Sequence, residues 1–449
     1  MPDDSPDDRA SDNPEDEFRD MLRDFLAGNS GIDPAQLAGA AGLPDDPEMI
    51  ARLISQLQSA LANSGDGINW GLALEQAKGI AGRTTVVSLP VERSQLEQAL
   101  HVASLWLDEV TTISQLTAEP RLMSRQEWVT ETMPVWTQLA EPVATSIANS
   151  LTDVLQQSAP EELDEMIQGA SQMMRNVGGT LFAMQLGQVV GQLSSEVVSG
   201  GDIGIPLLNE HQAAIVPQNA IAFGAGLDIP LDQVELYLAV RELAHARLFR
   251  HAKWLRLQLL TSITEFAKGM RIDTDRLGEL ANHFDPENPE ELREAMTSGA
   301  LIPPKSEDQL AALDRLETML ALIEGWVDVV TAQATSRLPS SAAIAETVRR
   351  RRASGGPAES AFATLVGLEL RPRRLREAAA MWQAVTDAVG NEARDALWSH
   401  PDLVPLAEDI DDPATLIARI TAGDPQPDDV DRAIEELLGD DTSERPHED

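Results

Sequence analysis

The stretch YLAVRELAHARLFRHAKWLR, residues 237–256, combines a helical pattern of apolar residues with side chains suited to chemistry. It lies within a longer helix that we expect over roughly 232–268, beginning at Leu231–Asp232. Glu242 and His245 are three residues apart, so they share one face of this helix. The stretch therefore predicts a helical scaffold that presents an acid and an imidazole side by side.

This spacing is close to that of a zinc-binding helix. The H-E-x-x-H motif places two histidines four residues apart on one helix face, with the glutamate as general base. Here the pattern is R-E-x-x-H, because Arg241 stands where the first histidine would be. An arginine side chain stays protonated and has no lone pair for a metal. The helix therefore offers one of the two zinc ligands that the full motif supplies.

Two interpretations of this helix face follow from the residues alone. In the first, His245 binds zinc together with ligands from elsewhere, and His211 and His283 in flanking irregular segments are candidates. In the second, Glu242 pairs with a cation such as Arg241, and His245 caps or packs. The sequence leaves both open.

A second acidic pair lies in IEGWVDVV, residues 323–330, inside a helix that we expect over 307–336. Glu324 and Asp328 are four residues apart in an otherwise apolar stretch. Acids in such surroundings are costly unless they are paired or functional. They are therefore either carboxylate ligands for the same metal or ion-pair partners of Arg241.

Most of the remaining chain also shows the apolar spacing that is typical of helices. The sequence predicts further helices over 46–62, 70–82, 92–109, 127–158 with breaks at Pro134 and Pro142, 161–198, and 373–389. Within the 161–198 helix, Gly187 and Gly191 are four residues apart and favour close packing against another helix.

The segment 202–230 interrupts the helical pattern. Its strings AAIV (213–216) and AIAF (220–223) predict short strands or extended turns, separated by Pro217–Asn219. The expected fold class is therefore mainly α, with at most a small β element.

Composition narrows the class of partner. The 449 residues carry 34 Lys+Arg against 74 Asp+Glu, a net charge of −40. Nucleic acids and anionic membranes require clustered cations, so neither is expected as a partner. The absence of cysteine excludes thiol catalysis, disulfides and iron–sulfur clusters. The sequence has neither a membrane-spanning apolar stretch nor a signal-peptide pattern, which predicts a cytoplasmic protein.

Arginines are concentrated in two runs between Arg349 and Arg376, around a Gly–Pro turn. Such a patch is either a cationic ligand site or a set of ion pairs with the acidic ends or the surface carboxylates of the same chain. Arginine binds carboxylates through paired hydrogen bonds, and this chain is rich in acids. We therefore expect ion pairs within the protein.

Several strings of the sequence together resemble a known family. They are INWGLALEQAKGIA (68–81), LWLDEVTT (105–112), LGQVVGQLSSEV (186–197), VPQNAIAF (216–223), LAVRELAHARLF (238–249), IEGWVDVV (323–330), GLELRPRRLREAAAMW (367–382) and DALWSHPDLVP (395–405). They resemble bacterial zincin-like metallopeptidases, named as hydrolases or zinc-dependent metalloproteases, whose wider relatives are associated with coenzyme F420 biosynthesis. The resemblance covers about 65–415.

The resemblance implies a helix-rich zincin-like fold in which the R-E-x-x-H helix is the active-site helix. It also implies that Glu242 is the general acid or base, that His245 binds zinc, and that Glu324 is a third ligand. Arg241 departs from the family pattern, because a guanidinium at the first ligand position would repel a metal ion. The resemblance thus implies zinc as the cofactor, whereas the positive charge of Arg241 disfavours zinc binding.

Four parts are expected along the chain. They are a disordered acidic tail over 1–17, an N-terminal helical segment over 18–64, a zincin-like helical domain over 65–415, and an acidic C-terminal tail with a short helix over 416–449.

Three functions are consistent with these features. The first is a zinc-dependent, metalloprotease-like hydrolase with a degenerate motif, in which Glu242 activates a zinc-bound water. The second is a non-catalytic zincin-fold protein that binds a peptide or protein partner. It predicts a salt bridge from Arg241 to Glu242, Glu324 or Asp328. The third is hydrolysis without metal by Glu242 and Glu324 as paired carboxylates.

Overall fold

The structure is a computed structural model that describes residues 68–157, 164–208, 212–269, 305–353, 357–368 and 374–422. The chain divides into two units, Met1–Gly67 and Ile68–Asp449, and all described residues belong to the second unit. The segments expected over 1–17 and 18–64, and most of the C-terminal tail expected over 416–449, therefore lie outside the described residues.

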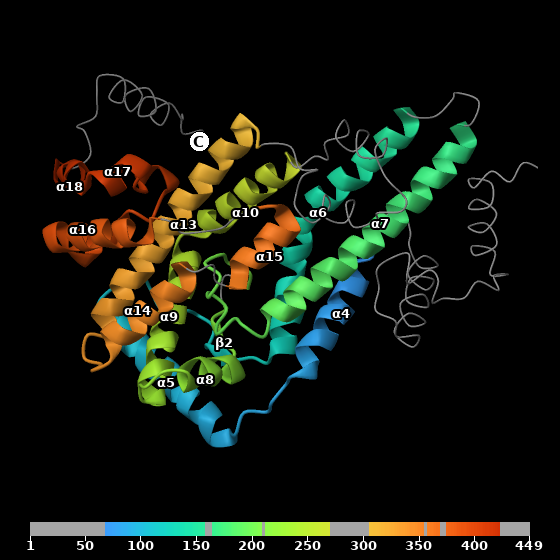
Figure 1. Ribbon diagram of the computed structural model, residues 1–449. Coiled ribbons are helices and arrows are strands. Elements are labelled where there is room, and N and C mark those ends of the chain that lie inside the picture. The colour runs from blue at the N-terminus through green and yellow to red at the C-terminus, as the bar shows by residue number, and fades with distance from the viewer. Residues whose placement is uncertain are drawn as a thin grey trace, which may run out of the picture. The chain divides into compact units, whose positions relative to one another are not determined.

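Helices make up most of the described chain (Figure 1). In order they are α4 (Trp70–Arg83), α5 (Pro90–Asp108), α6 (Arg125–Gln157), α7 (Asp164–Leu193), α8 (Pro217–Ala225), α9 (Leu231–His251), α10 (Lys253–Lys268), α13 (Glu307–Ala334), α14 (Ser341–Ala353), α15 (Pro357–Val366), α16 (Leu375–Ala396), η2 (Pro401–Leu403), α17 (Ala407–Asp411) and α18 (Pro413–Ala422). Within these ranges, no helix combines the length and the apolar character needed to cross a membrane. The mainly α class that the sequence predicts is confirmed.

The β structure of the described residues is one short pair of strands. β1 (Arg121–Leu122) and β2 (Ala214–Ile215) run parallel, with Arg121 opposite Ala214. An isolated antiparallel bridge joins Ser199 to Ile215. The small β element expected in segment 202–230 is therefore present, within the AAIV string.

The expectation for the AIAF string is wrong, because these residues lie in helix α8. Pro217 occupies the first turn of α8, where its missing N–H and fixed φ angle favour a helix start. The proline that was expected to separate two extended strings instead begins a helix.

Two helix boundaries also differ from expectation. The single helix expected over 232–268 is two helices, α9 and α10, because Ala252 has non-helical backbone angles (φ −94°, ψ 71°). Conversely, α6 continues through Pro134 and Pro142, where breaks were predicted. Its buried tryptophans and its contacts with α4 and α7 outweigh the hydrogen bonds that the prolines remove. Packing overrides the local signal of the prolines.

α9 is the central helix of the described fold. Its residues from Tyr237 to Phe249 are all buried, so this stretch has no solvent face. The helix packs against α5, α8, α13 and α14. The R-E-x-x-H residues therefore lie in the interior.

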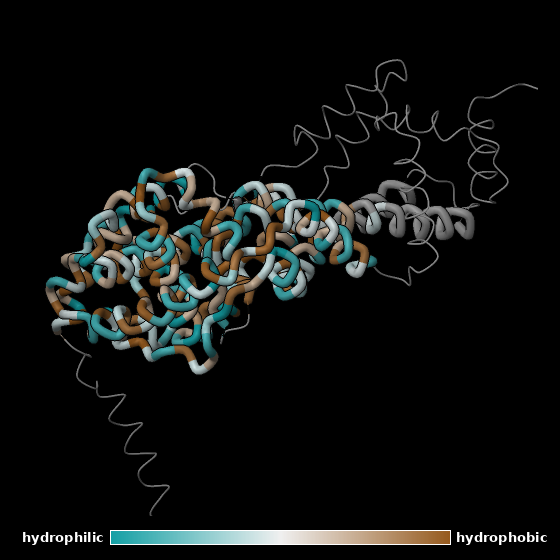
Figure 2. The backbone as a smooth tube through the Cα atoms, turned by 90° about the horizontal axis from the view of Figure 1, so that it is seen from below, coloured by the Kyte–Doolittle hydropathy of each residue, from teal (hydrophilic) through white to brown (hydrophobic). Residues whose placement is uncertain are grey.

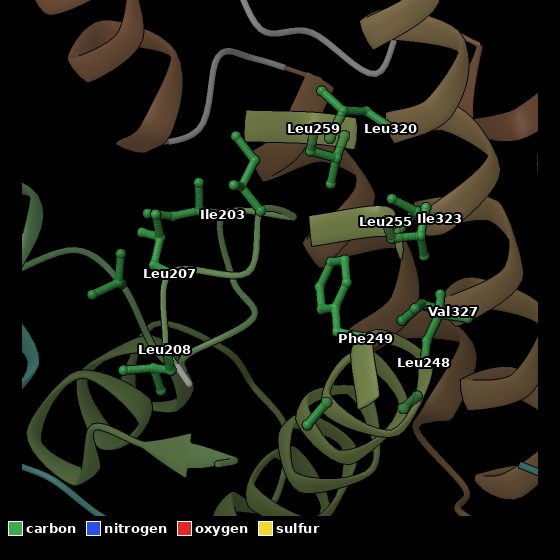
Figure 3. Packing of buried hydrophobic residues seen from close by; sticks show 14 of the residues in the cluster. Ile203, Leu207, Leu208, Leu248, Phe249, Leu255, Leu259, Leu320, Ile323 and Val327 are labelled. Carbon is green, nitrogen blue, oxygen red and sulfur yellow. The ribbon is translucent and has the colours of Figure 1, made fainter. Parts of the chain in front are cut away.

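Apolar residues from three directions surround the C-terminal half of α9. Figure 3 shows Ile203 and Leu207, on the loop after α7, across from Phe249, with Leu255 of α10 and Ile323 of α13 on its other side. Hydrophobic and hydrophilic residues alternate along the backbone of the described helices (Figure 2). The helices thus turn apolar faces toward one shared core.

α7 packs closely against α4 through glycines, as the sequence predicts. A Cβ atom at Gly187 would lie 2.6 Å from the carbonyl oxygen of Ala73. A Cβ atom at Gly191 would lie 2.8 Å from the Cβ of Ile80. Only glycine permits this approach of the two backbones.

Replacing Gly187 by alanine is expected to lower the free energy of unfolding by about 1–3 kcal/mol, because the new methyl group overpacks this contact. Gly178 on the same helix is the matched control, since a Cβ there meets nothing within 4 Å. Gly178→Ala should raise stability by up to about 1 kcal/mol through helix propensity. Urea denaturation measures both. A Gly187→Ala variant as stable as Gly178→Ala would contradict the close packing.

Glu235 is a buried carboxyl near the start of α9. The residue is 2% exposed, and its Oε1 has no hydrogen-bond partner among the described residues. Burial, helped by the nearby charges of Asp232 and Glu92, raises the pKa of Glu235 from 4.5 to about 7. The fold therefore favours the protonated form.

This raised pKa predicts a pH dependence of stability. The contribution of Glu235 to the free energy of unfolding is complete below pH 4.5 and is lost as the pH rises to about 7. Glu235→Gln, which cannot ionise, should exceed the native chain in stability at about pH 8 by on the order of 2 kcal/mol. The difference should shrink toward about pH 5. Denaturant unfolding at both pH values tests this, and a constant difference would refute it.

Candidate functional site

Glu242 is held by the backbone of two other segments. The residue is 1% exposed, its Oε2 accepts the N–H of Gly201 at 2.7 Å, and its Oε1 accepts the N–H of Ala214 at 2.9 Å. Burial raises the pKa of Glu242, against the opposing effect of these two N–H groups. Each oxygen therefore accepts a backbone hydrogen bond, and the side chain ties α9 to β2 and to the loop after α7.

His245 lies one turn after Arg241 and is 1% exposed. Its Nδ1 is 3.0 Å from the carbonyl oxygen of Arg241, and its Nε2 is 3.1 Å from Oε1 of Glu324. Both facing atoms are acceptors, so neither ring nitrogen faces open space.

Glu324 of α13 is the centre of the site and is fully buried. Its Oε2 accepts a hydrogen bond from Arg241 of α9, and its Oε1 accepts one from Arg352 of α14. Burial alone would raise the pKa of Glu324, but Arg352, Arg241 and His245 hold it well below its usual range. We call Arg241, His245, Glu324 and Arg352 the ion-pair cluster.

The glycine-rich loop SGGDIG, residues 199–204, covers the ion-pair cluster. A Cβ atom at Gly201 would lie 2.8 Å from the Cβ of His245, and one at Gly204 would lie 2.7 Å from Oε1 of Glu324. Gly204 also has a φ angle of +82°, which disfavours any other residue. Asp202 in this loop forms an ion pair with Arg351 at 2.9 Å. Close backbone contact and this ion pair hold the loop against the cluster.

Little space remains beside Glu242 and His245. The cavity that they line, together with the glycine-rich loop and Phe249, has a volume of about 20 Å³. A cavity of this size holds about one water molecule, whereas ligand pockets have volumes of about 300–1,000 Å³. In this conformation the site does not admit a peptide.

Zinc, which the motif and the fold imply, does not fit these residues. A catalytic zinc site needs about three ligands with free lone pairs and one open position. Both His245 nitrogens face acceptors, and Glu324 is held between two guanidinium groups that would repel a divalent cation. Within the described ranges, no group of three His, Asp or Glu side chains is arranged to hold a metal.

The candidate residues from the sequence do not all meet at one point. Arg241 is paired with Glu324, one of the partners expected for it, but Glu242 is bonded to backbone N–H groups and not to Arg241. Asp328 is joined to Arg349 at 2.7 Å. His211 and His283 lie outside the described residues.

The sequence pattern does not place Arg352 in the ion-pair cluster or Arg349 beside Asp328. The available signal is the arginine run itself, for which pairing with the acidic ends or with surface carboxylates is expected. The exposed pairs Arg374–Asp411 and Arg376–Glu346 agree with it. The partners of Arg349, Arg351 and Arg352 are instead the buried carboxylates of Asp328, Asp202 and Glu324. Nothing in the spacing indicates that α14 lies beside α13, so the partners could not be named.

A larger cleft lies on another face of α9. It has a volume of about 600 Å³ and is lined by α5, by the segment 115–122, and by Leu243 and Arg247 of α9. At 100° per residue these two side chains lie about 150° around the helix axis from Glu242 and His245. A ligand in this cleft would therefore not meet the R-E-x-x-H side chains.

Fold and site together define a mainly helical protein whose R-E-x-x-H helix carries a buried arginine–glutamate–histidine cluster. The chain belongs to the zincin-like metallopeptidase family, whose sequence profile matches residues 68–417. The family indicated by the resemblance is therefore confirmed.

A solved structure shares this fold. It is a protein of Chloroflexus aurantiacus, described provisionally as a hydrolase with a novel fold, and the TM-score is 0.54 at 20% sequence identity. The similarity covers 79% of this chain and 99% of that chain. No curated protein matches the sequence.

Proposed function

We propose that this chain is a metal-independent member of its family that acts by binding a peptide or protein partner. The observation that carries the proposal is the ion pair between Arg241 and Glu324. It joins the residue at the first ligand position of the motif to the residue that the family resemblance implies as a third ligand. A buried carboxylate that is saturated by Arg241, Arg352 and His245 serves as a structural junction between helices.

The volumes of two cavities beside α9 support the same proposal. The cavity at Glu242 and His245 is about 20 Å³, whereas the cleft beside Leu243 and Arg247 is about 600 Å³. The larger cleft and the motif residues thus lie on different faces of α9. A scaffold arranged in this way supports recognition without using the motif for chemistry.

The zinc content of the purified full chain tests the proposal. After expression in zinc-supplemented medium and dialysis, atomic absorption should find sub-stoichiometric zinc. Added zinc or EDTA should leave the denaturation midpoint unchanged. An ion bound to the folded state at a hundredfold excess over its Kd would instead stabilise by about 2.7 kcal/mol. Stoichiometric zinc that raises the midpoint would overturn metal independence.

Family membership favours a second candidate, a zinc-dependent peptide hydrolase. In this case Glu242 would act as general base, and the ion-pair cluster would have to open so that His245 and Glu324 become available. Cleavage of a labelled peptide library that EDTA abolishes, and that Glu242→Gln also abolishes, would establish this candidate. Cleavage of the same library that resists EDTA would point to paired carboxylates without metal.

A further inference from the structure

An apolar groove lies between α10, α13 and the segment 401–408, and it shares no residue with the ion-pair cluster. α10 and α13 lie side by side (Figure 1), and the groove beside them has a volume of about 360 Å³. Its lining includes Met319 and Leu322 of α13 and Val404 and Pro405 of the segment, all buried. The groove therefore has an apolar floor.

Large apolar side chains are exposed along this groove. Leu406, which lines it, is 61% exposed, and Leu403 in the same segment is 45% exposed. Leu310, one turn before the lining residue Asp314 of α13, is 51% exposed. Single exposed leucines are ordinary, but two on one wall of an apolar groove indicate an interaction site.

The wall formed by segment 401–408 is fixed before any partner binds. Trp398, just before it, stacks on Trp382 and Trp254, and the Nε1 of Trp254 donates to the carbonyl oxygen of Trp398 at 3.2 Å. At the other end, Asp409 accepts the N–H of Leu406 at 2.8 Å. A preformed wall loses little conformational entropy on binding.

The rim of the groove is acidic. Asp314 and Glu408 line it, are exposed, and form no ion pair among the described residues. Arg315 also lines the groove, where it is one cation beside two acids, and it lies 3.9 Å from a third acid, Glu265. A cationic occupant complements this rim, whereas a second copy of a chain with a net charge of −40 would be repelled.

The shape favours a helix as the occupant. Asp314, Thr318 and Leu322 follow one another at four-residue spacing along α13, which forms one ridge of the groove wall. An amphipathic helix laid beside such a ridge presents its own apolar side chains at the same spacing. An extended strand would need an open sheet edge, and the described lining offers none.

We propose that this groove binds an amphipathic helix of a partner protein, with Leu, Ile or Met on one face and Lys or Arg on its flanks. The inference rests on the proposed function, because both require a protein partner, and it names the partner's chemistry and a surface distinct from the cleft beside Leu243 and Arg247. The apolar face covers the exposed leucines, and the cations meet Asp314 and Glu408.

Fluorescence anisotropy of a labelled peptide tests the groove. The probe is a leucine–lysine helix of about 18 residues with one apolar face, and a second probe carries glutamate in place of lysine. The native full chain should bind the basic probe and not the acidic one. Leu406→Ser should weaken binding about tenfold, because one anchoring side chain is lost. Serine at this position also suits the N-cap of α17, so the fold is kept.

Matched variants distinguish binding in the groove from nonspecific attraction of a basic probe to an acidic chain. Leu105 of α5 is exposed to a similar extent, at 51%, so Leu105→Ser should leave the affinity unchanged. Asp314→Asn combined with Glu408→Gln should weaken binding and reduce its salt dependence.

Several outcomes would contradict the proposal that the groove binds a basic amphipathic helix. They are equal effects of Leu105→Ser and Leu406→Ser, equal binding of both probes, no binding of the basic probe, or a dimer in light scattering that Leu406→Ser converts to monomer. If Leu406→Ser binds the basic probe as tightly as the native chain does, the groove is not the binding site, and the proposed function is unaffected. Stoichiometric zinc together with EDTA-sensitive cleavage would contradict the proposed function. The anisotropy comparison would still test separately whether the groove binds a helix.

Discussion

Replacing Glu324 by alanine is expected to lower the free energy of unfolding by about 3–5 kcal/mol, which is typical of breaking a buried ion pair by removing one partner. Glu324 is fully buried and faces Arg241, Arg352 and His245. Without it, two guanidinium groups and an imidazole lose their shared acceptor in a place with almost no room for water. Urea denaturation followed by circular dichroism measures the loss.

Two controls make this result specific. Asp314→Ala, at an exposed acid of the same helix, should change stability by no more than about 0.5 kcal/mol. A triple variant with methionine at 241, 324 and 352 removes all three charges together and should recover much of the loss, because apolar side chains of similar volume replace buried ion pairs at little cost. A loss below about 1 kcal/mol for Glu324→Ala would contradict the role of Glu324 as a structural junction.

Asp395→Ala is expected to be about as costly, with a loss of about 3–5 kcal/mol. Asp395 is 2% exposed and accepts hydrogen bonds from Thr111 Oγ1 at 2.7 Å, Trp326 Nε1 at 3.0 Å and Arg394 Nε at 2.8 Å. It therefore joins α13 and α16 to the residues that follow α5. Arg394 is fully buried, so removing the carboxylate leaves an unpaired guanidinium in the core.

The comparison for Asp395 lies on the same helix. Asp387 is exposed and accepts a hydrogen bond from Gln383, so Asp387→Ala should stay within about 0.5 kcal/mol of the native chain. Asp395→Asn keeps the shape and loses the charge, so its stability should fall between the two alanine variants. If Asp395→Ala unfolds at the same urea concentration as Asp387→Ala, the junction at Asp395 contributes nothing.

Local patterns predicted the helices well where the signal was long and periodic. α4, α5 and α13 lie within a few residues of their predicted ranges, because apolar spacing over several turns is a strong signal. The proline-based expectations for α6 and for the AIAF string failed. A proline fixes local backbone geometry, but whether it breaks or begins a helix depends on the packing around it.

The site was predicted in part. Glu242, His245, Arg241 and Glu324 were identified from motif spacing and from acids in an apolar stretch, and the structure brings the last three into direct contact. Arg352 and the glycine-rich loop were missed, since both come from distant segments that carry no helical register with the motif. The link between Thr111 and Asp395 spans 284 residues and has no local signature either.

The sequence by itself determined the mainly α class, the family and the missing first ligand of the zinc motif, because these depend on residue types and on spacing along single helices. Only the tertiary structure decided which side chains surround Glu324. Arg241, Arg352 and His245 come from two helices and meet one carboxylate on a third. In a buried site the partners of a charge are set by which helices pack together, and the relative placement of helices cannot be read from the order of residues along the chain.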